Sequence, residues 1–287
     1  MSIFKAAAIQ MRSGEDVARN VEEFETRVRE AASHDAIYVQ TPEMTGALVR
    51  DKDARKSAFT SEDRDPVVAA AARLSRELGV AIHVGSTAIL RADGKLANRA
   101  FLFGRDGELV ARYDKIHMFD VDLDNGESWR ESSAYEAGTV AAVADLPFAR
   151  LGLAVCYDLR FPQLFRAEAM GGAEVLTVPA AFTRQTGEAH WHILLRARAI
   201  ENGAWVIAAA QGGKHEDGRE TYGHSLIVDP WGRIVAEAAN DAPGVIVAEI
   251  DTEASAAARR KVPNLKNARE FEVKRFGRPE ALRGAAS

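Results

Sequence analysis

Short apolar runs, each bounded by polar or turn-forming residues, recur along the whole chain. Their length is typical of β-strands, and several are apolar at nearly every position, which indicates strands buried on both faces. The runs lie at residues 4–11, 36–43, 80–90, 100–113, 150–158, 173–182, 204–213, 224–238 and 244–251. Two of them contain the turn-forming segments GRDG (104–107) and DPWG (229–232), which predict hairpins.

Helical patterns lie between some of these predicted strands. Apolar residues recur every three or four positions at residues 17–28 and 67–78, and again in the segment 188–203, which stops near Gly203. Strands and helices alternate without a Pro-, Gly- or Ser-rich linker or an internal repeat, so we expect one domain over residues 1–287. Helices outside largely buried strands predict a layered α/β architecture, but this pattern leaves the number of layers open.

The charge of the C-terminal segment differs in sign from that of the rest of the chain. The chain carries a net charge of −5, which argues against a general nucleic-acid binder because phosphate contacts require a basic surface. The C-terminal segment 259–287 is the exception, with nine Lys or Arg residues against three Glu. We expect this basic tail to pack on the body or on a second subunit; binding of RNA by the tail is the alternative.

The composition also limits where the protein works. No uncharged apolar run approaches the roughly 18 residues that a membrane helix requires, so we expect no membrane function. A single cysteine excludes an intramolecular disulfide framework, and the first residues form too short an apolar run for a signal peptide. These features predict a cytoplasmic protein.

That cysteine, Cys156, is a candidate for chemistry. A lone cysteine is more often a small core residue than a functional group. Here the buried run 150–155 predicts a strand before it, and Pro162 suits the first turn of a helix after it. A strand-to-helix turn exposes a side chain and leaves backbone N–H groups free to donate, as a nucleophile and its oxyanion require. The position alone leaves both interpretations open.

Two further ionisable residues follow predicted strands. Glu43 comes just after one apolar run and a proline, and Lys115 follows another run. Either residue alone is typical of solvated surface. Ligand sites in α/β sheets gather at the carboxyl ends of strands, so three such groups at three strand ends are more informative. A carboxylate can act as a base for a thiol, and an ammonium group can stabilise an oxyanion.

Glu43, Lys115 and Cys156, in this order, resemble the Glu-Lys-Cys triad of the nitrilase superfamily of carbon–nitrogen hydrolases. The resemblance spans nearly the whole chain. It is closest in YDKIHMFDVD (113–122), LGLAVCYDLRFPQLF (151–165), AFTRQTGEAHWHILLRARAIEN (181–202) and VIAAAQGGKHEDGRETYGHSLIVDPWG (206–232). The block 181–232 is especially similar to the Nit branch, whose members include deaminated glutathione amidases.

This resemblance implies a fold and a reaction. The fold is an αββα sandwich that dimerises through its layers. In the reaction, Glu43 takes the proton of Cys156, and the sulfur attacks an amide carbonyl because a thiolate is far more nucleophilic than a thiol. Lys115 and the backbone N–H of Tyr157 hold the oxyanion, and water then cleaves the thioester. No metal or cofactor is required.

The resemblance also implies a second glutamate that orients Lys115 and the substrate. Glu131 matches this position, and Glu127 is the alternative because the segment DLDNGESWRES (122–132) is longer and more acidic than the matching turn in relatives. A solvated loop residue is the other interpretation of Glu131.

Two more residues are expected to bind substrate. In relatives that cleave amides of 2-oxo acids, the positions of Arg160 and Thr186 bind the substrate carboxylate, and a guanidinium fork suits a carboxylate. The alternatives are a structural ion pair between Arg160 and Asp158, and a helix N-cap role for Thr186.

The expected activity is that of an amidase acting on a small 2-oxo acid amide with a carboxylate, with deaminated glutathione as the favoured substrate and 2-oxoglutarate and cysteinylglycine as products. An ω-amidase or a carbamoyl-amide hydrolase with the same triad is one alternative, and a catalytically silent binding or scaffold protein is another. The histidines show no spacing typical of metal ligands, so no metal site is expected (His83, His117, His192, His215 and His224).

Overall fold

Two six-stranded β-sheets lie face to face in the computed structural model, which describes residues 2–276 except 52–53, 56–57, 123–125 and 127. The first sheet has the strand order β16-β1-β2-β3-β4-β5 and the second β15-β14-β11-β10-β9-β8. The strands of the first sheet are β1 (Ile3–Gln10), β2 (Tyr38–Gln40), β3 (Ala81–Leu90), β4 (Leu96–Phe103), β5 (Leu109–Asp114) and β16 (Gly244–Asp251). Those of the second are β8 (Ala142–Leu146), β9 (Ala149–Leu153), β10 (Val175–Thr177), β11 (Trp205–Ala208), β14 (Leu226–Val228) and β15 (Ile234–Glu237).

The alternation of side chains along β1 explains the layering. Phe4, Ala6 and Ala8 belong to the apolar cluster shared with the second sheet, whereas Ala7 and Ile9 belong to the cluster beneath the helices of the first sheet. Successive residues of a strand point to opposite faces, so a strand that is apolar at both sets of positions must be covered on both sides.

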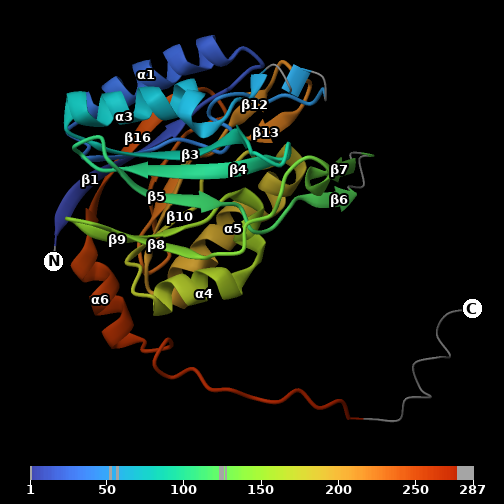
Figure 1. Ribbon diagram of the computed structural model, residues 1–287. Coiled ribbons are helices and arrows are strands. Elements are labelled where there is room, and N and C mark those ends of the chain that lie inside the picture. The colour runs from blue at the N-terminus through green and yellow to red at the C-terminus, as the bar shows by residue number, and fades with distance from the viewer. Residues whose placement is uncertain (1, 52–53, 56–57, 123–125, 127, 277–287) are drawn as a thin grey trace, which may run out of the picture.

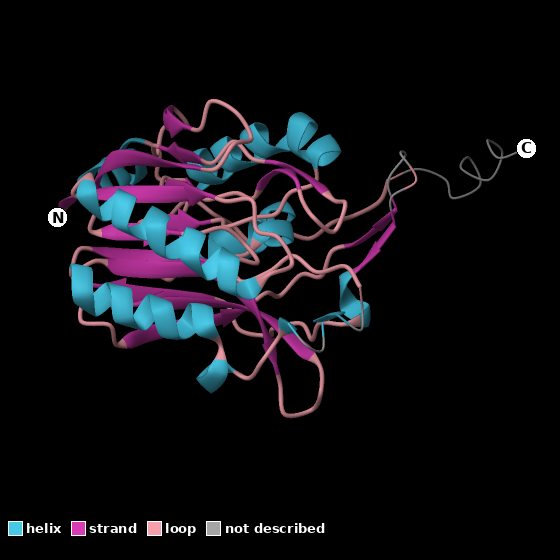
Figure 2. Cartoon of the chain, turned by 90° about the horizontal axis from the view of Figure 1, so that it is seen from above, coloured by secondary structure: helices cyan, strands magenta, loops and turns pink. Residues whose placement is uncertain are grey.

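Helices cover the outer face of each sheet. The helices α1 (Val17–Ser33) and α3 (Pro66–Leu78) lie side by side over the first sheet (Figures 1 and 2). On the second sheet, α4 (Pro162–Met170) and α5 (Arg184–Asn202) bury Phe165 and Trp191 in the shared core. The four layers form the αββα sandwich expected from the resemblance.

Local signals set the helix ends. The Asp65 carboxylate accepts hydrogen bonds from the N–H groups of Val67 and Val68 at the start of α3. Gly203 ends α5 with a φ of 54°, in the left-handed region that glycine adopts at low cost. The predicted hairpin turns are also present, since β4 pairs with β5 and β14 with β15, both antiparallel.

Shorter elements complete the fold. The two-stranded ribbons are β6 (Asp120–Asp122) with β7 (Ser128–Arg130), and β12 (Gly212–Lys214) with β13 (Glu220–Tyr222). The described part of the chain also contains the 3₁₀ turns η1 (Glu62–Arg64), η2 (Glu131–Ser133) and η3 (Cys156–Arg160). No helix among the described residues is long and apolar enough to cross a membrane.

The basic C-terminal tail has two parts. It begins in α6 (Thr252–Lys261), where the Arg259 guanidinium donates to the carbonyl oxygens of Asn202 and Ala173 and so packs on the body. Beyond α6 the chain leaves the body (Figure 1), and Phe271 and Phe276 are almost fully exposed. The last eleven positions of the tail, 277–287, lie outside the described residues.

Candidate active site

Three of the predicted site residues meet in one buried cluster. Glu43 lies in the turn after β2, Lys115 directly after β5, and Cys156 after β9 at the start of η3. The first two come from one sheet and the third from the other. The exposed fraction is 5% for Glu43, 2% for Lys115 and 7% for Cys156, so their mutual electrostatic interactions are only weakly screened by water.

The Glu43 carboxylate is held by hydrogen bonds on both oxygens. Oε1 accepts from Lys115 Nζ at 2.9 Å and from Asn98 Nδ2 at 2.8 Å. Oε2 accepts from the backbone N–H of Ala181 at 2.9 Å. The Cys156 thiol lies close enough to this carboxylate for each group to shift the pKa of the other. The arrangement fixes the orientation of the carboxylate toward the thiol.

Lys115 lies between two carboxylates. Besides Glu43, its Nζ donates to Glu131 Oε2 at 2.8 Å and Oε1 at 3.0 Å. Glu131 is itself held by the backbone N–H of Phe119 at 2.7 Å and by Asn98 Nδ2 at 3.0 Å. Glu131 therefore contacts the cluster directly, whereas the alternative residue Glu127 lies outside the described residues.

Charge states follow from this environment. Burial raises the pKa of the Glu43 carboxyl, but the charge and hydrogen bond of Lys115 outweigh it, so the pKa lies below its ordinary value. Burial lowers the pKa of Lys115, yet the Glu131 and Glu43 carboxylates raise it well above the ordinary value.

The pKa of the Cys156 thiol is shifted upward, whereas that of the Glu43 carboxyl is shifted downward. Burial and the neighbouring Glu43 charge raise the pKa of Cys156 well above its ordinary value, against the opposing effect of Lys115. At neutral pH the cluster thus holds an ionised carboxylate, a charged ammonium group and a neutral thiol. This is the arrangement in which a carboxylate can act as a general base toward a thiol.

The backbone at Cys156 is unusual. Its φ of 50° lies in the left-handed region, which a non-glycine residue seldom adopts without support from its surroundings. The Cys156 N–H donates to the carbonyl of Pro179 at 2.9 Å. Tyr157 follows in the same turn and lines the cavity, and its N–H stays the predicted oxyanion donor.

Asp158 anchors this turn, a role that the sequence did not predict for it. Its carboxylate is fully buried and accepts from Val155 N at 2.9 Å, from Tyr113 Oη at 2.7 Å and from His117 N at 3.0 Å. Two of these donors flank Lys115. A single carboxylate therefore couples the position of the Cys156 turn to the end of β5.

A cavity of about 480 Å³ opens onto the cluster. Its volume is within the range of small-molecule sites, roughly 300–1,000 Å³. Aromatic and basic side chains dominate its wall beyond the cluster: Arg50, Arg55, Phe119, Trp129, Arg130, Tyr135, Tyr157, Phe182 and Arg219.

The two predicted substrate-binding residues lie in different places. Thr186 lines the cavity, and its hydroxyl lies 2.8 Å from that of Thr183. Arg160 is not part of the described cavity wall. Its guanidinium stacks behind the rings of Tyr157 and Phe182, which are, and lies 3.3 Å from His190 Nδ1. No ion pair between Arg160 and Asp158 is present among the described residues; the Asp158 carboxylate is occupied by other donors.

None of the arginines in the cavity wall was predicted from the sequence, and two of them, Arg219 and Arg55, are considered as candidates for binding substrate. Arg219 pairs with Asp217 at 2.7 Å and stacks on the Trp129 ring at 5.1 Å. Arg55 donates from Nε to the carbonyl of Val49, and its guanidinium lies 6.0 Å from the Tyr135 ring. Both residues line the cavity, so they can contribute guanidinium groups to the binding of an anionic ligand.

Comparison with known proteins gives a consistent result. The profile of the family described as carbon-nitrogen hydrolase matches residues 5–260. A deaminated glutathione amidase of Yersinia enterocolitica is 42% identical over 266 residues, with 92% of each chain covered.

Among solved structures, the Caenorhabditis elegans NitFhit protein superposes with a TM-score of 0.87 at 32% identity, covering 94% of this chain and 66% of that one. Saccharomyces cerevisiae Nit3, described as a member of branch 10 of the nitrilase superfamily, gives a TM-score of 0.82 at 28% identity, covering 91% of this chain and 95% of that one. These similarities confirm the resemblance noted in the sequence.

Proposed function

Because the chain belongs to the carbon–nitrogen hydrolase family, we propose that it is an amidase that cleaves the side-chain amide of a 2-oxo acid through a thioester on Cys156. The observation that carries the proposal is the buried cluster itself, in which the ionised Glu43 carboxylate accepts a hydrogen bond from the Lys115 ammonium group and lies beside the neutral Cys156 thiol. A silent scaffold protein would have no need to keep this arrangement of charges in a cavity.

The reaction proceeds in two halves. Glu43 accepts the thiol proton as Cys156 Sγ attacks the amide carbonyl carbon, and the oxyanion is stabilised by Lys115 Nζ and the N–H of Tyr157. Collapse of the tetrahedral species breaks the C–N bond, and the proton on Glu43 passes to the leaving amine. Glu43 then removes a proton from water, which attacks the thioester carbonyl carbon. The C–S bond breaks, the acid is released, and the proton on Glu43 returns to the Cys156 sulfur. Glu131 acts by orienting Lys115.

The favoured substrate is deaminated glutathione, the substrate in the name of the Yersinia relative. Hydrolysis gives 2-oxoglutarate and cysteinylglycine. This substrate carries a carboxylate at each end, one on the 2-oxo acid and one on the glycine. We assign Thr186 to the first, together with Arg160, whose guanidinium has to move from its position beside the Tyr157 and Phe182 rings to reach the cavity. We assign Arg219, with Arg55, to the second.

This assignment separates the favoured substrate from its main alternative. An ω-amidase substrate such as 2-oxoglutaramate has the 2-oxo acid carboxylate but releases ammonia, so it offers nothing to Arg219. Pure protein with each compound, assayed for 2-oxoglutarate, cysteinylglycine and ammonia, tests the proposed function. Turnover of 2-oxoglutaramate alone would favour an ω-amidase, and turnover of neither would contradict both.

Two variants then test the assignment. Loss of one charged partner in a partly dry site costs about 2–5 kcal/mol, which corresponds to at least a 30-fold loss of kcat/KM. Arg219→Met should cause this loss for deaminated glutathione but not for 2-oxoglutaramate. Arg160→Met should cause it for both, but not for an amide that lacks a carboxylate. An equal loss for all three compounds would make the altered arginine a structural residue.

The oligomeric state and the compartment remain part of the proposal. A homo-oligomer is supported by the exposed apolar residues of the tail, which a second copy can cover. A reducing, cytoplasmic location is supported by a mechanism that requires the free thiol of Cys156.

A further inference from the structure

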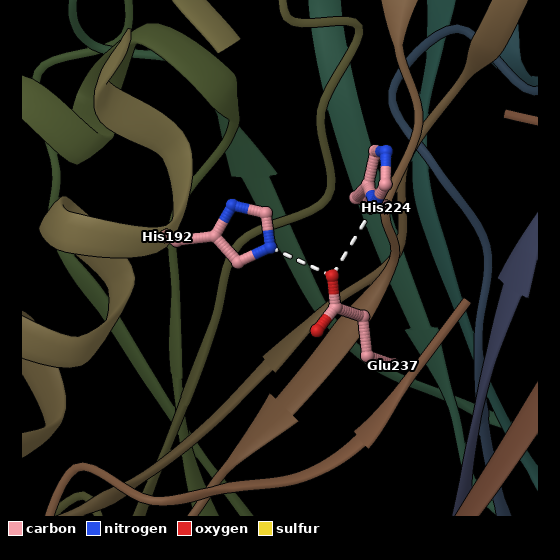
Figure 3. A group of neighbouring side chains, drawn as sticks. All are labelled: His192, His224 and Glu237. Carbon is pink, nitrogen blue, oxygen red and sulfur yellow. Dashed lines mark hydrogen bonds and ion pairs between the residues drawn. The ribbon is translucent and has the colours of Figure 1, made fainter. Parts of the chain in front are cut away.

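Two histidines and a glutamate form a cluster outside the cavity (Figure 3). His192 lies on α5, His224 between β13 and β14, and Glu237 at the end of β15. His192 Nε2 lies 2.8 Å and His224 Nδ1 lies 3.2 Å from the same oxygen, Oε1 of Glu237. The three potential ligand atoms all lie within 4.8 Å of one another, and none of the three residues belongs to the described cavity wall.

From this geometry we propose that the cluster binds a divalent transition-metal ion of the Zn²⁺ class, independently of the proposed amidase function. A tetrahedral Zn²⁺ ion with ligands at about 2.0–2.2 Å holds neighbouring ligand atoms roughly 3.3–3.5 Å apart. The 3.2 Å separation is close to this spacing, and the 2.8 Å separation requires an increase of about half an ångström.

The ligand types favour this class of ion. Two imidazoles and one carboxylate suit Zn²⁺ and its transition-metal neighbours, whereas Mg²⁺ and Ca²⁺ prefer six or more oxygen ligands. The side chains of His192, His224 and Glu237 are 28%, 26% and 34% exposed, so solvent reaches the site and water can complete the coordination.

The backbone holds the three positions together before any ion binds. Trp191, next to His192, donates from Nε1 to the carbonyl of His224 at 2.9 Å. Glu237 is the register partner of Leu226, two residues after His224. Each of these backbone contacts lies within two residues of a proposed ligand. The three side chains therefore lose little conformational freedom when an ion binds.

The Tyr222 ring packs against both imidazoles. It stacks on His224 with centroids 4.5 Å apart and contacts the edge of His192 at 5.8 Å. Such contacts limit the rotation of the rings. Coordination requires the lone pairs of His192 Nε2 and His224 Nδ1, so in a neutral imidazole the proton moves to the other ring nitrogen, and an imidazolium releases a proton to solvent.

The test is titration of the full-length, metal-free protein with Zn²⁺ by isothermal calorimetry. We expect one ion per chain at micromolar or lower concentrations and a rise in Tm on binding. His192→Ala and Glu237→Gln should each weaken the affinity at least tenfold, while amidase activity in metal-free buffer stays unchanged because neither residue belongs to the proposed catalytic cluster.

Two controls separate this cluster from other sites. His34→Ala removes an exposed histidine elsewhere and should leave the affinity unchanged. Cys156→Ser removes the thiol of the cavity and should also leave it unchanged. Loss of binding in Cys156→Ser, unchanged binding in His192→Ala and Glu237→Gln, or no stoichiometric binding by the unaltered protein would overturn the proposal.

Discussion

At the residue scale, Glu43 is buried and yet must stay ionised to accept a proton, and these two requirements usually conflict. A base buried in an apolar environment is stabilised in its neutral form, which cannot accept a proton. Here Lys115 supplies the compensating charge at 2.9 Å, and Glu131 in turn balances Lys115. Burial and the charge of Glu43 raise the pKa of Cys156 despite the opposing effect of Lys115, and so disfavour a resting thiolate.

Glu43→Gln tests the base directly. The amide has nearly the same shape but cannot accept the thiol proton, so we expect turnover to fall below detection and no thioester to form. Intact-mass spectrometry of rapidly quenched mixtures checks the acyl-enzyme. Glu77→Gln, which alters an exposed carboxylate paired with Arg29, is the control and should behave as the unaltered protein. A normal acyl-enzyme yield in Glu43→Gln would exclude Glu43 as the base.

The pH dependence of kcat/KM follows from the charge states. The pKa of Glu43 is lowered from 4.5, so the base stays ionised, and activity persists, until the pH falls below that value. The raised pKa of Lys115 keeps its charge at alkaline pH. We expect a plateau from weakly acidic to weakly alkaline pH, measured by steady-state kinetics. An acid limb centred above the ordinary carboxylate pKa would contradict this assignment of the base.

The candidate cluster was largely predictable from single positions, but its surroundings were not. Glu43, Lys115 and Cys156 each follow an apolar run, so their placement at strand ends could be inferred. Arg219 lies in the turn between β12 and β13, and no local pattern shows that this hairpin packs against the cavity. The proposed ligands His192, His224 and Glu237 are separated by 32 and 13 positions. The pairing of β14 with β15 brings Glu237 near His224, and the packing of α5 against the second sheet adds His192.

At the scale of elements, the turn η3 depends on Asp158. We expect Asp158→Asn to lower Tm and kcat, because an amide cannot accept all the hydrogen bonds of the buried carboxylate and each lost partner costs about 1–3 kcal/mol. Calorimetry and kinetics measure the two effects. Asp145→Asn, at an exposed carboxylate paired with Arg150, is the matched control.

The rate at which Cys156 is alkylated distinguishes a positioning role of Asp158 from a purely structural one. Its loss should slow the alkylation of Cys156 by iodoacetamide, because the turn that presents the thiol is loosened. A variant with lower Tm but an unchanged alkylation rate at temperatures where it stays folded would show a purely structural role.

The apolar pattern predicted where helices and strands lie better than it predicted how long they are. The run 36–43 yields only the three-residue strand β2, because Pro42 and the turn at Glu43 end the ladder. The helix expected over 188–203 starts earlier, at Arg184. The ribbon β6–β7 was not expected, since its strands are polar and mostly exposed and carry no burial pattern.

At the scale of the whole molecule, the exposed tail beyond α6 predicts association. Phe271, Val273 and Phe276 are 85–94% exposed, and burying such side chains against a second copy is favourable. We expect multi-angle light scattering to show a symmetric homo-oligomer at micromolar concentration. Removal of the residues after Lys261 should shift it toward smaller species. A full-length protein that is monomeric under these conditions would contradict the prediction.

The pairing of β1 with β16 places a constraint on synthesis at the ribosome. β1 joins β2 on one side, but its other edge is completed only when Gly244–Asp251 emerges, since Gln10 pairs with Gly244 and Ile3 with Asp251. At roughly 5–20 residues per second, that edge waits for about 12–50 s. An unpaired apolar strand is a template for aggregation, so the nascent chain needs shielding during this interval more than the finished protein does.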